Sequence, residues 1–152
     1  MDGVQAAKWC LEHNMIQQGL TILQEIIVCY LLLKIGVSVD NILHREIASK
    51  AINILYNETE EEKWDQKAKQ HANLTRKYCN VCKSERELVK KYVVLTDFRN
   101  DMNHAGYRPN PKPPETFVTK LEELIPWAID YFGHHRINTD NLETTTQNGK
   151  QK

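Results

Sequence analysis

Apolar residues recur at the three- and four-residue spacing of an α-helix along most of the chain, which predicts an all-α fold. The first such segment, Val4 to His13, is a short amphipathic helix that Asn14 is suited to end in a left-handed conformation. Residues 15 to 35 leave so little polar surface that we expect the central, most buried helix there. Its stripe consists of Ile16, Leu20, Leu23, Ile27, Tyr30 and Leu31, widened by Ile22, Ile26, Cys29 and Leu33.

Gly36 breaks the pattern, and another helix is predicted to run from there to Tyr56, with Ser38 or Asp40 as its N-terminal cap. Its apolar stripe consists of Leu43, Ile47, Ala51, Ile54 and Leu55. Further on, Ser84-Glu85-Arg86-Glu87 has the form of a capping box, which predicts the start of the next long helix.

Four prolines between Tyr107 and Pro114 predict an extended loop, because proline cannot continue a helix. A last helix is expected from about Glu115, with a kink at Pro126, and it closes a bundle of about five helices. From Gly133 the residues are polar and aperiodic. We therefore predict one all-α domain at residues 1–133 and a disordered tail at 134–152.

The chain of 152 residues has a formal net charge of zero, so any RNA-binding surface must be a local patch. The stretch from Lys63 to Lys91 is the most basic region of the chain, with nine Lys or Arg against three acidic residues. It is either a solvated helical hairpin or a path that leads RNA by its phosphates. The candidate contacts on such a path are Lys67, Arg76, Lys77, Lys90 and Lys91, together with Arg108 beyond it.

No signal peptide is visible at the start, and the longest apolar run, Ile26 to Leu33, is much shorter than the roughly 20 residues that span a bilayer. A cytoplasmic protein without a membrane partner is expected. Cys79 and Cys82 have the spacing of half a zinc site, but a structural zinc needs four ligands and there is no second pair. His71, His134 or His135 could complete the site only if the fold happened to bring them next to the two cysteines. We therefore predict no metal and no cofactor.

The candidate functional site lies where the apolar stripe of Leu88, Tyr92, Leu95 and Met102 meets a polar cluster. Arg99 falls on this stripe. Its guanidinium stays charged in a protein, so on a face bound for burial it needs an anionic partner, either a carboxylate of the bundle or a phosphate. His104 follows five residues later, with an ordinary pKa of about 6.5 that allows proton transfer near neutrality.

Arg99 and His104 do not share a helical face, since five residues at about 100° each place them roughly 140° apart. Asn100 is the helical neighbour of His104, and Asn103 is that of Arg99. Either the last turn unwinds to redirect His104, or two copies of the helix assemble the site. A purely structural interpretation is also open, in which Arg99 binds an acidic neighbour and His104 is a favourable cation at a helix C-terminus.

The string Arg99-Asn100-Asp101-Met102-Asn103-His104-Ala105-Gly106-Tyr107-Arg108-Pro109-Asn110-Pro111 resembles the signature of HEPN domains. It is most similar to the HEPN half of CRISPR-associated nucleases that carry an N-terminal CARF sensor. Ala7-Lys8-Trp9-Cys10-Leu11-Glu12-His13 and Gln17-Gln18-Gly19-Leu20-Thr21-Ile22-Leu23-Gln24-Glu25 resemble the start of that half. The chain has no strand-rich segment for the sensor itself.

This resemblance implies a metal-independent endoribonuclease of CRISPR-associated antiviral defence, which cleaves single-stranded RNA by attack of the ribose 2′-hydroxyl. It also implies a homodimer that brings two motifs together across a twofold axis. Arg99 would then stabilise the phosphorane, His104 would transfer protons, and Asn100 and Asn103 would orient His104 or the phosphate. Two alternatives remain: a non-catalytic HEPN module that dimerises or binds nucleotides, and a toxin-type HEPN ribonuclease.

Overall fold

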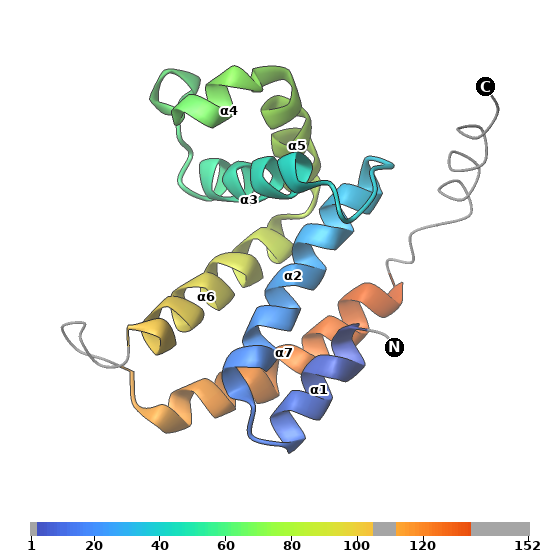
Figure 1. The fold of residues 1–152 in the computed structure, drawn as a ribbon, viewed down its shortest axis with the longest axis vertical. Coiled ribbons are helices and arrows are strands. Elements are labelled where there is room, and N and C mark those ends of the chain that lie inside the picture. The colour runs from blue at the N-terminus through green and yellow to red at the C-terminus, as the bar shows by residue number, and fades with distance from the viewer. Residues whose placement is uncertain (1–2, 105–111, 135–152) are drawn as a thin grey trace, which may run out of the picture. The chain divides into compact units, whose positions relative to one another are not determined.

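The computed structural model describes residues 3–104 and 112–134, and these form helices with no strand among them (Figure 1). The elements are α1 (Gly3–Glu12), α2 (Ile16–Lys34), α3 (Ile42–Tyr56), the short 3₁₀ helix η1 (Glu61–Lys63), α4 (Gln66–Gln70), α5 (Ala72–Ser84), α6 (Arg86–Asn103) and α7 (Pro114–His134). The all-α prediction is confirmed. The described residues hold seven α-helices instead of about five, because the basic stretch forms α4 and α5.

The first two helix ends are set by residues in the left-handed conformation. Asn14 has a φ of 56°, and the amide of Met15 bonds back to the carbonyl of Cys10 at 2.7 Å. Gly36 has a φ of 73°, and a backbone bond of the same kind joins Val37 to Leu32 at 3.1 Å. Both predicted helix ends are therefore confirmed.

Two predicted N-terminal caps are wrong. Asn41 caps α3 by accepting the amide of His44 at 3.1 Å, while Ser38 and Asp40 hydrogen-bond to each other. Ser84 still belongs to α5, so its hydroxyl donates to the Val81 carbonyl of that helix at 2.7 Å and cannot cap the next one.

The helix after Ser84 begins at Arg86. The carbonyl of Glu85 accepts the first backbone bond of α6, from Val89 at 3.0 Å. The Glu85 carboxylate is buried, and it accepts the Tyr30 hydroxyl at 3.0 Å and contacts the Lys34 ammonium at 3.1 Å. The residue that precedes α6 is therefore Glu85, whose carboxylate makes a tertiary contact with α2, and the predicted box of Ser84 and Glu87 does not have Ser84 as its cap.

The chain divides into two compact units, and the first consists of Met1–Ile27 and Lys90–His135. Here α1 packs on α7, and the first part of α2 and the later part of α6 complete the core (Figure 1). Gly19 of α2 lies so close to α7 that a Cβ there would meet the Leu121 Cδ2 atom at 2.6 Å. The core of this unit includes Ala7, Leu20, Leu23, Leu95, Leu121, Leu124 and Ala128, all at most 1% exposed.

Among the described residues, the second unit consists of Val28–Val89. Its main contact is between α3 and α5, and α4 packs on both of them (Figure 1). Fully buried side chains of this core include Leu31, Leu32, Ile47, Ile52, Tyr78 and Leu88. Residues 135–152 of the predicted tail lie outside the described residues, as does most of the predicted proline-rich loop.

Helix α2 is long and apolar enough to cross a membrane by length and composition alone, and 56% of its most apolar segment is buried inside the protein. A buried core helix has the same composition. The predicted burial of this helix is confirmed by Leu20, Leu23, Ile27, Leu31 and Leu32, which are all at most 1% exposed, and cytoplasmic localisation stays a prediction.

Candidate functional site

Arg99 lies on α6 and is directed at Gln24 of α2. Its Nη1 atom donates to the Gln24 Oε1 atom at 2.6 Å, and the Nε2 atom of the same amide donates to the Thr96 hydroxyl at 2.8 Å. Gln24 is only 5% exposed, and it sits between Leu20 and Ile27 on the buried stripe of α2. Because both ends of the amide are bonded, its oxygen is fixed in the direction of the guanidinium.

The partner of Arg99 is therefore a neutral amide and not a carboxylate. Among residues 3–104 and 112–134, Arg99 forms no ion pair, and the adjacent Glu25 is exposed on α2. The acidic partner considered for Arg99 is replaced by Gln24. An amide orients a guanidinium without cancelling its charge, so the full positive charge of Arg99 stays available to an anion.

His104 directly follows the last residue of α6 and is exposed. Its backbone amide bonds to the carbonyl of Asn100 at 3.1 Å, which is the spacing of an α-helix. The last turn therefore does not unwind to redirect His104. At helical geometry the side chains of Arg99 and His104 leave α6 in directions that differ by roughly 140°.

The two asparagines of the motif are both exposed, and Asn103 is tied to α2. Its Oδ1 atom accepts a hydrogen bond from Gln17 Nε2 at 2.7 Å. Gln17 and Gln24 are two helical turns apart on α2, so they lie on the same face. Two amides of α2 thus hold the C-terminal half of α6, one at Arg99 and one at Asn103.

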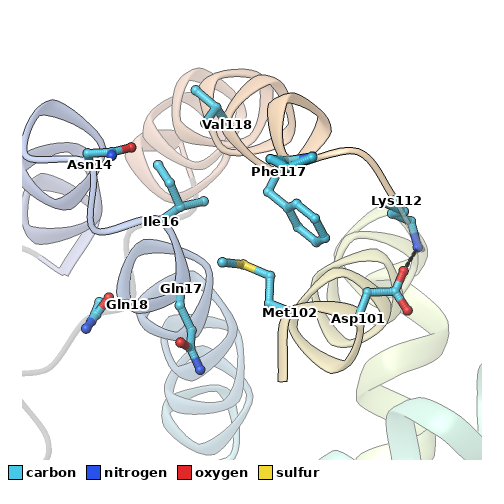
Figure 2. A pocket seen from close by; sticks show the side chains of 10 residues that line it. Asn14, Ile16, Gln17, Gln18, Asp101, Met102, Lys112, Phe117 and Val118 are labelled. Atoms are coloured by element: carbon cyan, nitrogen blue, oxygen red, sulfur yellow. Dashed lines mark hydrogen bonds and ion pairs between the residues drawn. The ribbon is translucent and has the colours of Figure 1, made fainter. Parts of the chain in front are cut away.

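A pocket of about 700 Å³ lies next to the motif, between the start of α2, the end of α6 and the start of α7 (Figure 2). Its lining combines apolar and polar side chains, namely Ile16, Met102, Pro114, Phe117 and Val118 with Asn14, Gln17, Gln18, Asp101 and Lys112. Asp101 and Met102 come from within the predicted motif. They lie between Arg99 and His104 in the sequence. Their side chains line the pocket, whereas Arg99 and His104 are not among its lining residues.

Lys112 binds the chain that follows the motif back onto α6. Its ammonium contacts the carboxylates of Asp97, at 2.8 Å, and of Asp101, and it lies 4.9 Å from the centre of the Phe98 ring. The side chain of Asp101 is only 9% exposed. Hydrogen bonds to Asp101 and then Asp97 raise the pKa of Lys112 above its ordinary value.

Three of the predicted RNA contacts are engaged in ion pairs. Lys67 pairs with Glu46, Arg76 pairs with Glu61, and Lys91 lies 3.6 Å from Glu123. The Lys91 ammonium also lies 5.5 Å from the centre of the Trp127 ring. Exposed ion pairs of this kind are weak, so these side chains can still exchange partners.

Of the other three predicted RNA contacts, two are described by the structure and one is not. Lys77 and Lys90 are exposed, and Arg108 lies outside the described residues. Lys67, Arg76 and Lys77 belong to the second unit, and Lys90 and Lys91 to the first. The RNA path stays a prediction.

Cys79 and Cys82 are both buried in the second unit. Burial raises the pKa of the Cys82 thiol to about 12 and raises that of Cys79 as well, so both favour the protonated form that metals do not bind. No group of three metal-binding side chains occurs within the described ranges. His135, one of the conceivable further ligands, lies beyond them.

Gln24, Gln17 and Lys112 are the residues around the motif that the sequence did not single out. Gln24 interrupts the apolar face of Leu20, Ile27 and Leu31, which indicates a buried polar contact but not its partner. Gln17 is exposed and Lys112 sits in a proline-rich stretch, so neither stood out from its surroundings.

The chain matches no family model, no curated protein and no solved structure. The resemblance to HEPN nucleases therefore stays a prediction, which depends on the motif and on the two strings near the start of the chain.

Proposed function

We propose that the protein is a metal-independent endoribonuclease that cleaves single-stranded RNA at a site formed by Arg99 and His104. The observation that supports this most is the pairing of Arg99 with the neutral Gln24 amide, at 2.6 Å. A guanidinium that only stabilises a fold usually meets a carboxylate, whereas Arg99 is held by an amide and has no carboxylate partner among residues 3–104 and 112–134. Such a group is suited to bind a phosphate.

The reaction needs no group beyond the protein and the RNA. The 2′-oxygen of the ribose attacks the adjacent phosphorus, the bond from phosphorus to the 5′-oxygen breaks, and a 2′,3′-cyclic phosphate forms. A base removes the 2′-hydroxyl proton and an acid protonates the leaving 5′-oxygen, so the proton count is unchanged. In the proposal, His104 serves as one of these groups and Arg99 stabilises the charge on the phosphorane.

A pair of subunits would supply these groups to one pocket. The helical bond from His104 to Asn100 keeps the two side chains on different faces of one α6. Two copies of α6 facing each other would allow the Arg99 of one and the His104 of the other to reach the same phosphate. Asn100 would orient His104. Asn103 already has a partner in Gln17, and would have to act through its amide nitrogen.

The test compares the parent with His104→Ala on labelled single-stranded RNA, with EDTA present throughout. General acid–base catalysis contributes about 10²- to 10⁴-fold, so His104→Ala is expected to slow cleavage at least about a hundredfold. His134→Ala is the matched control, because His134 is also an exposed histidine at a helix C-terminus. This control should cleave like the parent.

Cleavage by His104→Ala at the parental rate would overturn the proposal. So would cleavage by the parent that occurs in parallel reactions without EDTA and is lost when EDTA is present, because this would point to a metal. If neither protein cleaves RNA but both bind it, the non-catalytic module is the better description. Duplex RNA, and DNA without the 2′-hydroxyl, should resist cleavage.

A further inference from the structure

The geometry points to a nucleobase as the occupant of the pocket between α2, α6 and α7, namely a base of the RNA whose phosphate meets Arg99. The inference rests on the proposed function for the source of that base. The pocket measures about 700 Å³, within the roughly 300–1,000 Å³ of sites that take small organic ligands.

The inner surface of the pocket suits a flat apolar ring. Ile16, Met102 and Phe117 point into the same space from three different helices (Figure 2). Phe117 already packs edge-on against Phe98, with ring centres 5.7 Å apart, so its position is fixed. A thioether and a fixed aromatic ring are the groups against which a heterocycle packs well.

The charge balance of the pocket favours a neutral ligand. Its charged lining residues are Asp101 and Lys112, and they are paired with each other (Figure 2). The Lys112 ammonium is shared further with Asp97, so the described residues leave no net positive charge there for a phosphate. An anion would therefore go to Arg99, and the pocket would receive the uncharged part of the same substrate.

The rim of the pocket offers hydrogen bonds of the kind that recognise bases. Asn14, Gln17 and Gln18 each carry an amide with one acceptor and two donors. Gln17 uses one amide hydrogen in its bond to Asn103. Within the described residues, no hydrogen-bond partner is found for the side-chain amides of Asn14 and Gln18. A carboxamide can pair with two adjacent atoms of a base edge, as Asn and Gln do with adenine.

The pocket is also next to the motif that contains the proposed catalytic residues. Asp101 and Met102 lie between Arg99 and His104 in the sequence, and Gln17 contacts both the pocket and Asn103. A nucleotide whose base enters the pocket would therefore place its sugar and phosphate near the end of α6.

The test uses the full chain labelled at its methionine methyl groups, of which there are three in the sequence. Adenosine, guanosine, cytidine and uridine are titrated separately, with ribose as the probe that lacks a base. The Met102 signal is expected to shift in a saturable way with at least one nucleoside and not with ribose. No shift with any nucleoside, or an equal shift with ribose, would overturn the inference.

A double variant, Asn14→Gly with Gln18→Leu, tests the amide rim. Glycine accepts the φ of 56° at position 14 without strain, and Gln18 is exposed, so the fold should survive. The variant should weaken nucleoside binding at least about fivefold, the loss expected when a good two-point contact to a base is removed. Unchanged binding would contradict the role of the rim. Gln5→Leu, at an exposed position of α1 outside the pocket, is the control and should bind like the parent.

The cleavage assay separates this inference from the proposed function. Nucleoside binding does not require His104, so it should persist in His104→Ala while cleavage is lost. RNA cleavage without any effect of nucleosides on Met102 would overturn the pocket inference alone. Nucleoside binding at Met102 without RNA cleavage would overturn the proposed function and leave a base-binding pocket.

Discussion

Arg99 and Gln24 are joined by a hydrogen bond of 2.6 Å in which a charged guanidinium of α6 donates to a neutral amide of α2. The amide is itself held by Thr96, so the guanidinium is positioned on one side, and no described carboxylate neutralises its charge. The nature of this one partner decides whether Arg99 is a structural cation or one available to a substrate.

Gln24→Glu should therefore weaken RNA binding at least about tenfold. The new carboxylate would lie within hydrogen-bond distance of the guanidinium and neutralise it. Binding is measured as the dissociation constant for labelled single-stranded RNA, with His104→Ala also present so that the RNA stays intact. Circular dichroism melting checks that the fold is retained.

Gln5→Glu makes the same change of charge at an exposed position of α1, and it should leave the dissociation constant within about twofold of the parent. If Gln24→Glu binds RNA as tightly as this control, Arg99 does not contact the phosphate.

Gly19→Ala should lower the free energy of unfolding by about 1–3 kcal/mol, the usual cost of overpacking a core. The added methyl would meet the Leu121 Cδ2 atom at 2.6 Å, and Leu121 is fully buried and cannot swing away. Urea denaturation measures the change. Gly133→Ala is the control, because nothing lies within 4 Å of its added methyl. It should be neutral or stabilising by up to about 1 kcal/mol, from helix propensity. Equal effects at both positions would contradict the close packing of α2 on α7.

Lys112→Met should destabilise the protein by about 1–3 kcal/mol, because it removes a charged donor to Asp101. That carboxylate is only 9% exposed, so water cannot fully replace the lost contact. Lys63→Met also breaks an ion pair, but both partners there are about 70% exposed, and its effect should stay below about 0.5 kcal/mol. The two unfolding curves are compared in urea. A change at Lys112 as small as that at Lys63 would mean that the Asp101 contact does not hold the chain.

A thiol reagent at pH 8 should label one cysteine quickly in the native protein and four after denaturation. Cys29 is partly exposed, whereas Cys10, Cys79 and Cys82 are buried. Burial also raises the pKa of Cys82 to about 12, so its reactive thiolate is scarce at this pH. Absorbance of the released reagent gives the count, and peptide mapping gives the site. Rapid labelling at Cys79 or Cys82 would contradict the burial of this pair.

Stability should fall at alkaline pH. The pKa of Cys82 is raised from an ordinary 9.0 to about 12, and the pKa of Tyr78 is also raised, in both cases mainly by burial. A raised pKa in the folded state means that unfolding releases protons once the pH exceeds the unfolded value. The contribution of Cys82 is therefore complete below about pH 9 and is lost as the pH rises toward 12.

The free energy of unfolding is measured between pH 7 and pH 11 with a reductant present. Each such group should lower it by at most about 1.4 kcal/mol per pH unit. Cys82→Ala should remove part of the decline between pH 9 and pH 10. A parent profile that stays flat over this range would contradict the effect of burial on Cys82.

Helix ends that depend on one residue could be predicted from the sequence. Asn14 and Gly36 end their helices because the left-handed conformation is a local preference of asparagine and glycine. The prediction of an N-terminal cap was wrong where several neighbouring residues can each cap the helix. Ser38, Asp40 and Asn41 are all good caps, and the choice among them depends on where the following helix packs.

The partner of Arg99 could not be predicted for a related reason. Gln24 and Glu25 are adjacent on α2, and only the packing of α6 decides which of them faces the guanidinium. The apolar stripe of α2 is so wide that it does not give this direction. Glu85 shows the same limit, since its role comes from Tyr30 and Lys34, far away in the sequence.

The anchoring of Lys112 has an evolutionary consequence. Residues 105–111 lie between two anchored neighbours. His104 precedes them, and its amide is bonded within α6, while Lys112 follows them and is bound to Asp97 and Asp101 of the same helix. When both ends of a segment are secured, doubling its length costs only about 0.6 kcal/mol in closure entropy. Insertions between these two anchors would therefore leave the flanking helices undisturbed. Natural variants could lengthen the segment after α6 with little loss of stability.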